Sequence, residues 1–258
     1  MIKIFIFTSL LFSSLFSLEI SDFINPDSCG YKNIIINKQV YSICYNTSMK
    51  GPKYVGYRLD GSLVNKNNIQ KRPRFYTEKK LPKKYRVKPS DFTYTGTQRG
   101  HMANHASFDY DTSVLRKTYS MANISPQYPK INYPVWSKAE QAERSHAKRL
   151  GYVNVINIVL YDNPTNYLHR ISLDEAMASH PDKKSPYGKW SSKRIKKYYR
   201  DAKKLLNKKI VIPSQYVKII WNDDKNFMKC YLYDNNPLFV SKGDKLKHHL
   251  VNCDNFLF

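Results

Sequence analysis

The amino-acid sequence predicts a single domain of the α+β class, built on a mixed or antiparallel sheet. With 258 residues the chain is long enough to bury a full core. Residues 38–45 and 54–59 alternate apolar and polar side chains, as half-buried strands do, and residues 153–161 form a continuous apolar run typical of a buried strand. Two other segments, 134–150 and 191–209, have the period and end signals of helices. A sheet with helices packed on it is therefore expected.

Shorter patterns predict the remaining strands. Residues 94–101 and 119–124 are expected to pair with each other, and residues 212–221 and 229–233 to form two strands near the C-terminus. The segment 72–89 carries many lysines, arginines and prolines but little periodicity. We therefore expect an extended, basic, solvent-facing segment there.

The helix predicted at residues 134–150 has clear boundaries. Pro134 suits the first helical turn, where its missing N–H costs nothing, and Gly151 lies just past the end, where a left-handed residue is favoured. At about 100° per residue, positions spaced i, i+4 and i+8 share one face of a helix, and here they are Trp136, Glu140 and Arg144. This face begins beside Asn132.

The second helix, at residues 191–209, is rich in lysine. Ser191 or Ser192 is a suitable N-cap, and an apolar stripe is formed by Ile195, Tyr198, Tyr199, Ala202, Leu205 and Leu206. We expect the stripe to pack against the body of the protein. The cationic face is either solvated only or follows the phosphate backbone of a nucleic acid.

The charge balance of the chain is extreme. It contains 43 Lys and Arg against 20 Asp and Glu, a formal net charge of +23, and its pI is about 9.7. Such a field concentrates polyanions and speeds their encounter with the surface, so nucleic acid is the expected partner. An anionic membrane surface or an acidic glycan is the alternative that charge alone leaves open.

The first 17 residues predict a secretory signal peptide. Lys3 is followed by an apolar run at residues 4–16 and by a small residue, Ser17, and this run is shorter than the roughly 20 residues that span a bilayer. A retained membrane anchor is the alternative. Removal at Ser17 would leave residues 18–258 as the mature domain, exported to the periplasm or outside the cell, with no membrane span.

Export would allow the four cysteines to form disulfides, for which three pairings are possible. Local pairing at the two ends of the mature chain, Cys29 with Cys44 and Cys230 with Cys253, is expected. Closing a loop of about 15 residues, as the first pair would, is worth roughly 3 kcal/mol when only chain entropy is considered. A zinc site made of the same cysteines is the competing hypothesis, but no Cys-x-x-Cys spacing supports it.

One short stretch concentrates groups that suit phosphodiester chemistry. It reads Arg99-Gly100-His101-Met102-Ala103-Asn104, and it is followed by Asn123-Ile124-Ser125-Pro126-Gln127 and then by Asn132, Trp136, Glu140 and Arg144. These segments resemble the DNA/RNA non-specific endonuclease family, whose ββα-metal (His-Me finger) site has Asp-Arg-Gly-His, Asn-Ile-Thr-Pro-Gln and Asn-x-x-x-Trp. A similar Ile-Pro-Ser…Tyr-x-Lys strand, here at residues 212–218, extends the resemblance, which covers about residues 41–237.

The resemblance implies a role for several of these residues. His101 would be the general base, since an imidazole that titrates at about pH 6.5 needs little tuning to act at neutral pH. Asn132 would supply a side-chain oxygen to Mg²⁺, or to Mn²⁺ or Ca²⁺ in its place, and Glu140 would orient the water molecules around the cation. Asn123 would position the base.

The resemblance also implies arginines that hold the substrate phosphate, because a guanidinium matches phosphate oxygens in pairs. Arg74 stands where the family has its phosphate clamp, although Arg72 is two residues away and the register of this loop is open. Arg99 and Arg144 are expected to face phosphate as well. Trp136 is expected to anchor the helix by packing rather than to stack on a base.

One position departs from the family pattern. Gln98 stands where the family usually has Asp, which removes a negative charge near His101 and the cation, and modest tuning is the expected effect. His105, four residues after His101, raises the alternative of a two-histidine zinc site, but the stretch lacks the helical pattern and the intervening Glu of that motif.

The expected function is sequence-tolerant endonucleolytic cleavage of DNA, and of RNA as well, with Mg²⁺ as the cofactor. The family resemblance implies products with 5′-phosphate and 3′-hydroxyl ends. The alternative is a nucleic-acid-binding protein that keeps the scaffold but cuts poorly because of Gln98.

Overall fold

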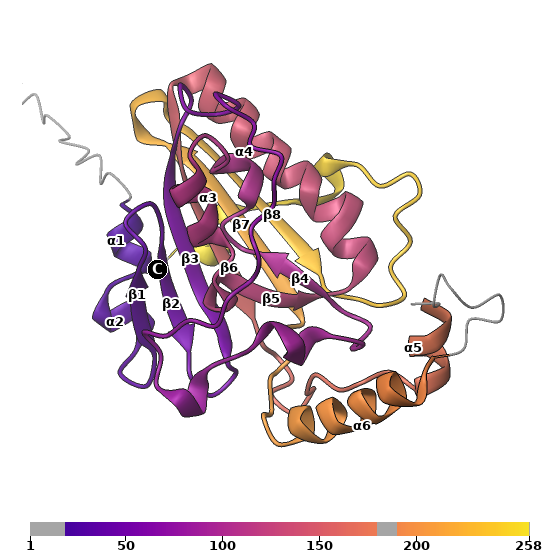
Figure 1. Ribbon diagram of the computed structural model, residues 1–258. Helices are drawn as coiled ribbons and strands as arrows, with labels where there is room; N and C mark the ends of the chain where they lie inside the picture. Colours follow the sequence, from indigo (N-terminus) through magenta and orange to yellow (C-terminus); the bar gives the residue numbers. More distant parts are fainter. Residues whose placement is uncertain (1–18, 180–189, 258) are drawn as a thin grey trace, which may run out of the picture.

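The computed structural model describes residues 19–179 and 190–257 and confirms the α+β class (Figure 1). Its centre is an antiparallel sheet in the order β1-β2-β3-β6-β7-β8-β9, and a separate small sheet pairs β4 with β5. The predicted signal peptide, residues 1–17, lies outside the described residues. Within the described part of the chain, no helix is long and apolar enough to cross a bilayer.

The element boundaries define both layers of the fold. The strands are β1 (Ile34–Asn37), β2 (Ser42–Asn46), β3 (Gly51–Asp60), β4 (Gln98–His101), β5 (Ile124–Gln127), β6 (Tyr152–Leu160), β7 (Gln215–Asn222), β8 (Phe227–Asp234) and β9 (Leu250–Val251). The helices are α1 (Ile20–Phe23), α2 (Pro26–Cys29), α3 (Thr112–Thr118), α4 (Ser137–Leu150), α5 (Leu173–Ser179) and α6 (Ser192–Leu206). The two long helices, α4 and α6, are the ones that the sequence predicted.

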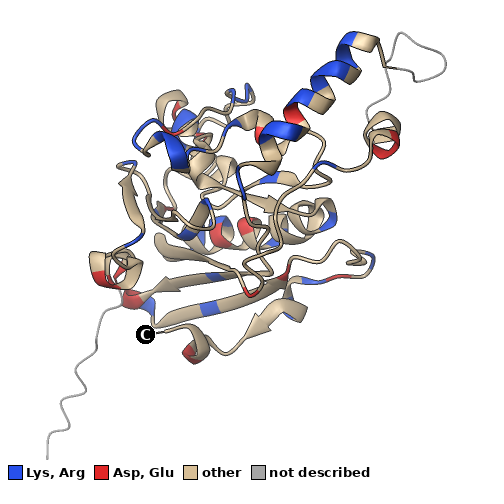
Figure 2. Cartoon of the chain, turned by 90° about the horizontal axis from the view of Figure 1, so that it is seen from below, with Lys and Arg blue, Asp and Glu red and all other residues tan. Residues whose placement is uncertain are grey.

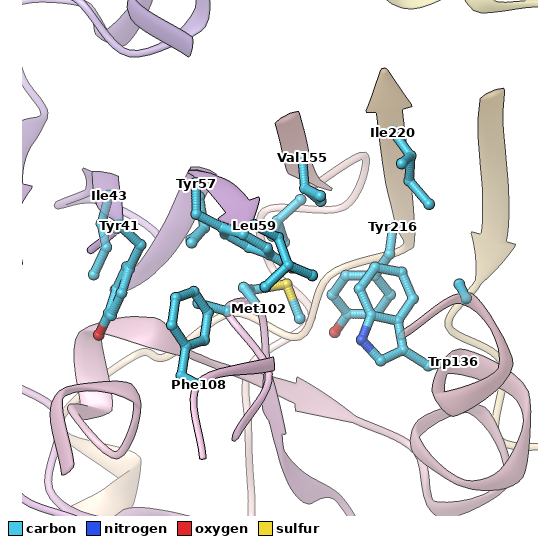
Figure 3. Packing of buried hydrophobic residues seen from close by; sticks show 14 of the residues in the cluster. Tyr41, Ile43, Tyr57, Leu59, Met102, Phe108, Trp136, Val155, Tyr216 and Ile220 are labelled. Atoms are coloured by element: carbon cyan, nitrogen blue, oxygen red, sulfur yellow. The ribbon is translucent and has the colours of Figure 1, made fainter. Parts of the chain in front are cut away.

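One face of the large sheet packs against α4 and the segment that follows β4. Tyr57 of β3 lies opposite Val155 of β6, which lies opposite Ile220 of β7, so these side chains share that face. Figure 3 shows the face filled by Met102, Phe108 and Trp136. Trp136 is fully buried, as expected for a packing anchor.

The opposite face of the sheet is covered by both ends of the described chain. Phe23 of α1 packs against Trp221 of β7, with ring centroids 5.8 Å apart, and Phe256 and Leu257 join the same cluster. The N-terminal and C-terminal segments therefore meet on one side of the sheet, away from α4.

Two disulfides fasten these terminal segments, and both predicted pairings are confirmed. Cys29 is bonded to Cys44 of β2 with the Cα atoms 5.5 Å apart, and Cys230 of β8 is bonded to Cys253 with the Cα atoms 5.3 Å apart. Since these bonds use all four cysteines, the competing hypothesis of a cysteine zinc site is wrong.

The small sheet is shorter at its first strand than the sequence predicted. Only Gln98–His101 is strand, because the backbone upstream turns. Tyr94 and Gly96 both adopt left-handed backbone, with φ of 58° and 70°. An alternating sequence pattern does not reveal such a turn.

The second strand of the small sheet begins later than predicted. Residues 121–123 form a turn of 3₁₀ helix instead, and the hydroxyl of Ser120 accepts a hydrogen bond from the N–H of Ala122 at its start. The strand β5 begins at Ile124, so the prediction of a strand at residues 119–124 is wrong over most of its length.

The helix α4 begins at Ser137, later than predicted. The preceding residues, Ile131–Trp136, form a wider π-type turn in which Tyr133 is extended, with φ −145° and ψ 129°. Pro134 therefore lies in this turn rather than in the first turn of α4. At the other end the helix stops at Leu150 as predicted, and Gly151 has a φ of 91°.

The helices α5 and α6 project from one end of the domain (Figure 1). Ser191 caps α6 by accepting a hydrogen bond from the N–H of Arg194. The predicted packing of the apolar stripe is confirmed for Tyr198 and Leu205, which are buried, and Tyr198 packs with Trp190; Tyr199 and Leu206 are exposed, so for them the prediction is wrong. The lysines and arginines cover the outer face of the helix (Figure 2).

Candidate active site

A cleft of about 1040 Å³ lies between the small sheet, the turn that precedes α4 and the basic segment before β4. Its wall includes most of the residues to which the sequence assigned chemistry: Arg72, Gln98, Arg99, His101, Asn132 and Glu140. Tyr94, Ile171 and Ser179 extend the wall toward α5 and α6. Segments far apart in the chain therefore meet at one site.

Strand pairing brings His101 to the cleft. Gly100 lies opposite Ser125, and His101 lies opposite Ile124. A Cβ atom on Gly100 would lie 1.9 Å from the side-chain oxygen of Gln127, so only glycine allows this close approach. The glycine before His101 thus lets the two strands pair up to the residue that lines the cleft.

Asn123 holds the chain that follows His101. The fully buried Asn123 accepts a hydrogen bond from the N–H of Ala103 at 2.8 Å and donates to the carbonyl oxygens of Ala103 and Thr118, each at 2.9 Å. Asn157 of β6 donates to the carbonyl oxygen of Met102 at 2.8 Å. All of these contacts of Asn123 are to backbone groups, as a positioning residue requires.

The imidazole of His101 lies in an aromatic cage. The ring centroids of Phe75, Tyr119 and His105 lie 5.3, 5.0 and 5.8 Å from its own. Burial, followed by the charges of His105 and Arg72, lowers the pKa of His101 to about 3, so the ring is neutral at pH 7 and able to accept a proton. His101 lines the cleft, and within the described residues its buried Nε2 has no hydrogen-bond partner.

Asn132 and Gln98 meet beside the turn that precedes α4. Nδ2 of Asn132 donates a hydrogen bond to Oε1 of Gln98 at 2.6 Å. An amide that donates through its nitrogen keeps its carbonyl oxygen for another partner. Gln98, the departure from the family pattern, therefore orients the amide of Asn132.

Glu140 lines the same cleft from α4. Burial raises the pKa of Glu140 to about 7; the charges of Lys218 and Arg144 oppose this shift, and the charge of Glu143 adds to it. A carboxyl group whose pKa lies near neutral pH can lose its proton and bind a cation after a small rise in pH or in cation concentration.

Arg72, rather than Arg74, lies on the wall of the cleft. Arg72 contributes to the lowered pKa of both His101 and His105, which places its charge close to the two imidazoles. Arg74 is exposed and is not among the residues that line the cleft. Of the two arginines, Arg72 is therefore the one that lies beside the imidazole of His101.

The other two arginines are held by the protein. Arg99 lines the cleft, but its Nη2 donates to the carbonyl oxygen of Pro89 at 2.8 Å and its guanidinium lies 5.3 Å from the ring centroid of Phe75. Arg144 donates through Nη1 to Oδ1 of Asn104 at 3.1 Å; it lies just behind the cleft wall, where its charge acts on His105 and Glu140, which line the cleft. Both therefore have a protein contact that fixes part of the guanidinium.

Sequence reasoning missed the residues behind the cleft. The carboxylate of Glu143 and the ammonium of Lys218 are fully buried and form an ion pair with N and O 2.5 Å apart. Lys218 belongs to the Tyr-x-Lys strand that resembles the family, which was a usable signal, but Glu143 sits in a charged helix without any sign of burial. The aromatic cage of Phe75 and Tyr119 was also missed.

The donors in the cleft fit a hydrated hard cation. The side-chain oxygen of Asn132 and the carboxylate of Glu140 are oxygen donors of the kind that Mg²⁺ prefers, and Mg²⁺ keeps several of its water molecules where protein donors are few. Among the described residues, no group of three or more His, Cys, Asp or Glu could hold a metal ion. His101 and His105 lie edge to face, with neither placed on a long helix.

A two-stranded sheet that leads into a helix, with a histidine at the end of the first strand and an asparagine before the helix, defines the ββα-metal class of nuclease folds. A solved structure of EndoG in complex with EndoGI has this fold; it matches with a TM-score of 0.63 at 18% sequence identity, over 88% of this chain and 84% of that one.

The chain belongs to the DNA/RNA non-specific endonuclease family, whose match extends over residues 21–256 and confirms the resemblance seen in the sequence. A protein named nuclease from Nostoc sp. is 31% identical over 116 residues, which are 45% of this chain and 42% of the relative. Human mitochondrial endonuclease G is 24% identical over 119 residues, 46% of this chain and 39% of the relative. The chain therefore matches less than half the length of these relatives.

Proposed function

We propose that the protein is an endonuclease that hydrolyses phosphodiester bonds of DNA and also of RNA, with little sequence preference and with Mg²⁺ as its cofactor. One observation carries this proposal: His101, Asn132 and Glu140 come from separate elements and line one cleft. Family membership supports it, since the relatives are named nucleases.

Each residue has a step that its surroundings favour. The neutral His101 takes a proton from the attacking water, and a bound phosphate near Arg72 raises its basicity by offsetting that cation. Arg72 and Arg99 neutralise charge on the non-bridging oxygens. Asn132 and Glu140 would hold the cation and its water shell, and the cation would supply positive charge to the phosphate and the leaving oxygen.

The substrate is held mainly by its backbone. Seven cations lie along α6: Lys193, Arg194, Lys196, Lys197, Arg200, Lys203 and Lys204. The side chains of Lys193, Lys196, Lys197 and Arg200, spaced i, i+3, i+4 and i+7, line a groove along one side of the helix. Backbone contacts position a nucleic acid without reading its bases, which fits a sequence-tolerant enzyme.

The protein acts outside the cytosol in this proposal. Two disulfides are of the kind that persist in oxidising compartments, and the segment 1–17 has the pattern of a cleaved signal peptide. The periplasm and the extracellular space both satisfy these conditions.

A catalytically weak nucleic-acid-binding protein is the second candidate, and the neutral Gln98 beside Asn132 is the observation that favours it. Incubating the purified mature protein with supercoiled plasmid and with folded RNA, with Mg²⁺ or with chelator, separates the two. We expect nicked and linear plasmid and fragmented RNA, with 5′-phosphate ends, only when Mg²⁺ is present. Tight binding without cleavage at any divalent cation concentration would favour the binding protein.

A further inference from the structure

A buried polar cluster lies behind the cleft, between α4 and the large sheet. Its centre is the carboxylate of Glu143, which is fully buried and accepts hydrogen bonds from the Tyr57 hydroxyl at 2.9 Å and the Ser107 hydroxyl at 2.8 Å. Lys218 and the side-chain amide of Asn104 also donate to this carboxylate. The cluster joins β3, β7, α4 and the chain that follows His101.

The carboxylate determines which way the Asn104 amide faces. A carboxylate only accepts hydrogen bonds, so the amide must turn its Nδ2 toward Glu143. Oδ1 of Asn104 then faces the opposite side, where it accepts from Nη1 of Arg144 at 3.1 Å and from the N–H of Ser107 at 3.0 Å. Asn104 is 1% exposed, so water does not compete for these bonds.

Lys218 holds the carboxylate of Glu143 in place. Its ammonium pairs with that carboxylate, and both side chains are fully buried. A carboxylate paired in this way accepts hydrogen bonds only, so the amide of Asn104 keeps one orientation. Lys218 thus acts on Arg144 through two intermediate side chains.

We infer that Asn104, oriented by the Glu143–Lys218 pair, is a positioning residue that holds the guanidinium of Arg144 for the substrate phosphate. This inference rests on the proposed function. Asn104 occupies one N–H of Arg144 and leaves the remaining donors of the guanidinium for phosphate oxygens. A guanidinium fixed before substrate arrives needs no reordering during the reaction.

A double-mutant cycle on Asn104 and Arg144 tests this inference. We expect Asn104→Ala to lower kcat by up to about 100-fold with little change in KM, because a misplaced group loses interactions made in the transition state. In the Arg144→Ala protein the same change should have almost no further effect on kcat. Full additivity of the two effects would overturn the inference.

Tyr57→Phe is the matched control for a loss of stability alone. It removes a donor to Glu143 but leaves the hydrogen bonds of Asn104 to Glu143 and Arg144, so it should lower the melting temperature without the drop in kcat. If Tyr57→Phe lowers kcat as far as Asn104→Ala does, the cluster is merely structural. Should Asn104→Ala not fold, Asn104→Ser serves in the same cycle.

A second readout does not depend on cleavage. In protein labelled with ¹⁵N-arginine, the Arg144 guanidinium signal, identified by its disappearance in Arg144→Ala, should show restricted rotation that is absent in Asn104→Ala. Free rotation of this group in the unmodified protein would refute positioning even if the enzyme is active. Restricted rotation of the Arg144 guanidinium in a protein that does not cleave nucleic acid would refute the proposed function but not the positioning of Arg144.

Discussion

The side-chain amide of Asn132 donates a hydrogen bond to Gln98 at 2.6 Å, which joins the start of β4 to the turn that precedes α4. Gln98 is the residue that departs from the family motif, and its oxygen accepts the bond that a carboxylate oxygen would accept in the same place. The departure therefore preserves the orientation of Asn132 and removes only a negative charge.

Restoring that charge should strengthen cation binding. We expect Gln98→Asp to lower the Mg²⁺ concentration for half-maximal activity by a few-fold, since an exposed pair of charges gains about 1 kcal/mol or less. Gln141→Asp, on the exposed face of α4 and away from the cleft, is the matched control and should shift nothing. Equal Mg²⁺ requirements for both variants and the unmodified protein would mean that Gln98 is not beside the cation.

The pH dependence of activity should follow Glu140 rather than His101. With pKa values of about 7 and about 3, only Glu140 titrates near neutrality. At low Mg²⁺ concentration, kcat/KM should rise as the pH increases through about 7. A higher Mg²⁺ concentration should move this rise to lower pH, because a cation favours the ionised carboxylate. Glu140→Gln should abolish the Mg²⁺-dependent movement. If kcat/KM rose at the same pH at every Mg²⁺ concentration, the role of Glu140 would be contradicted.

The raised pKa of Glu140 should also make the stability of the protein depend on pH. The pKa of Glu140 is raised from 4.5 to about 7, so below about pH 4.5 both the native and the unfolded carboxyl are protonated, and the native state loses stability as pH rises through 7. Without a cation, Glu140→Gln should therefore be more stable than the unmodified protein at pH 8, with a smaller difference at pH 5. Urea denaturation at the two pH values measures this difference.

Breaking the buried ion pair should be costly. Lys218→Met would leave the buried Glu143 without its ionic partner, and breaking a buried pair in this way typically costs about 3–5 kcal/mol in the free energy of unfolding. Lys225→Met, at an exposed position next to β7, should change it by less than about 0.5 kcal/mol. Pairing Lys218→Met with Glu143→Leu should recover part of the stability. Near-native stability of Lys218→Met would show that the pair is not buried as described.

The outer face of α6 should contribute to binding through salt-dependent interactions. For each phosphate of duplex DNA that the protein no longer neutralises, the slope of log affinity against log salt should flatten by about 0.9. In a His101→Ala background that prevents cleavage, we expect Lys196→Glu with Lys197→Glu to flatten this slope without changing sequence preference. Lys148→Glu with Lys225→Glu, at exposed positions that do not line the cleft, is a control of equal charge change. Identical slopes with and without the α6 substitutions would mean that the charge of α6 serves another partner, such as an anionic cell surface.

Much of the fold could be predicted because its elements carry their own local signals. The apolar run at residues 153–161 predicted β6, and Gly151 predicted the end of α4 at Leu150. The predictions failed where contacts with side chains of distant segments determine the backbone conformation. The 3₁₀ turn at residues 121–123 ends at the buried Asn123, whose side chain bonds to the backbone of Ala103, 20 residues earlier in the chain.

The site was predicted less completely than the fold. The Arg-Gly-His motif identified His101, but no local pattern shows that Arg72 rather than Arg74 reaches the cleft, since both lie in a segment without regular structure. Glu143 was missed for a similar reason: burial of a charged helical residue depends on Lys218, which lies on another element.

The measurement that tests the account most directly is cleavage of plasmid by His101→Ala in saturating Mg²⁺, beside DNA binding by the same protein. Removing a general base typically costs about 10² to 10⁴-fold, so we predict a decrease of this size in kcat with DNA affinity unchanged. His146→Ala, on the far half of α4 against Phe227, is the matched control and should cut normally. Turnover of His101→Ala near that of the unmodified protein would contradict the assignment of His101 as the base.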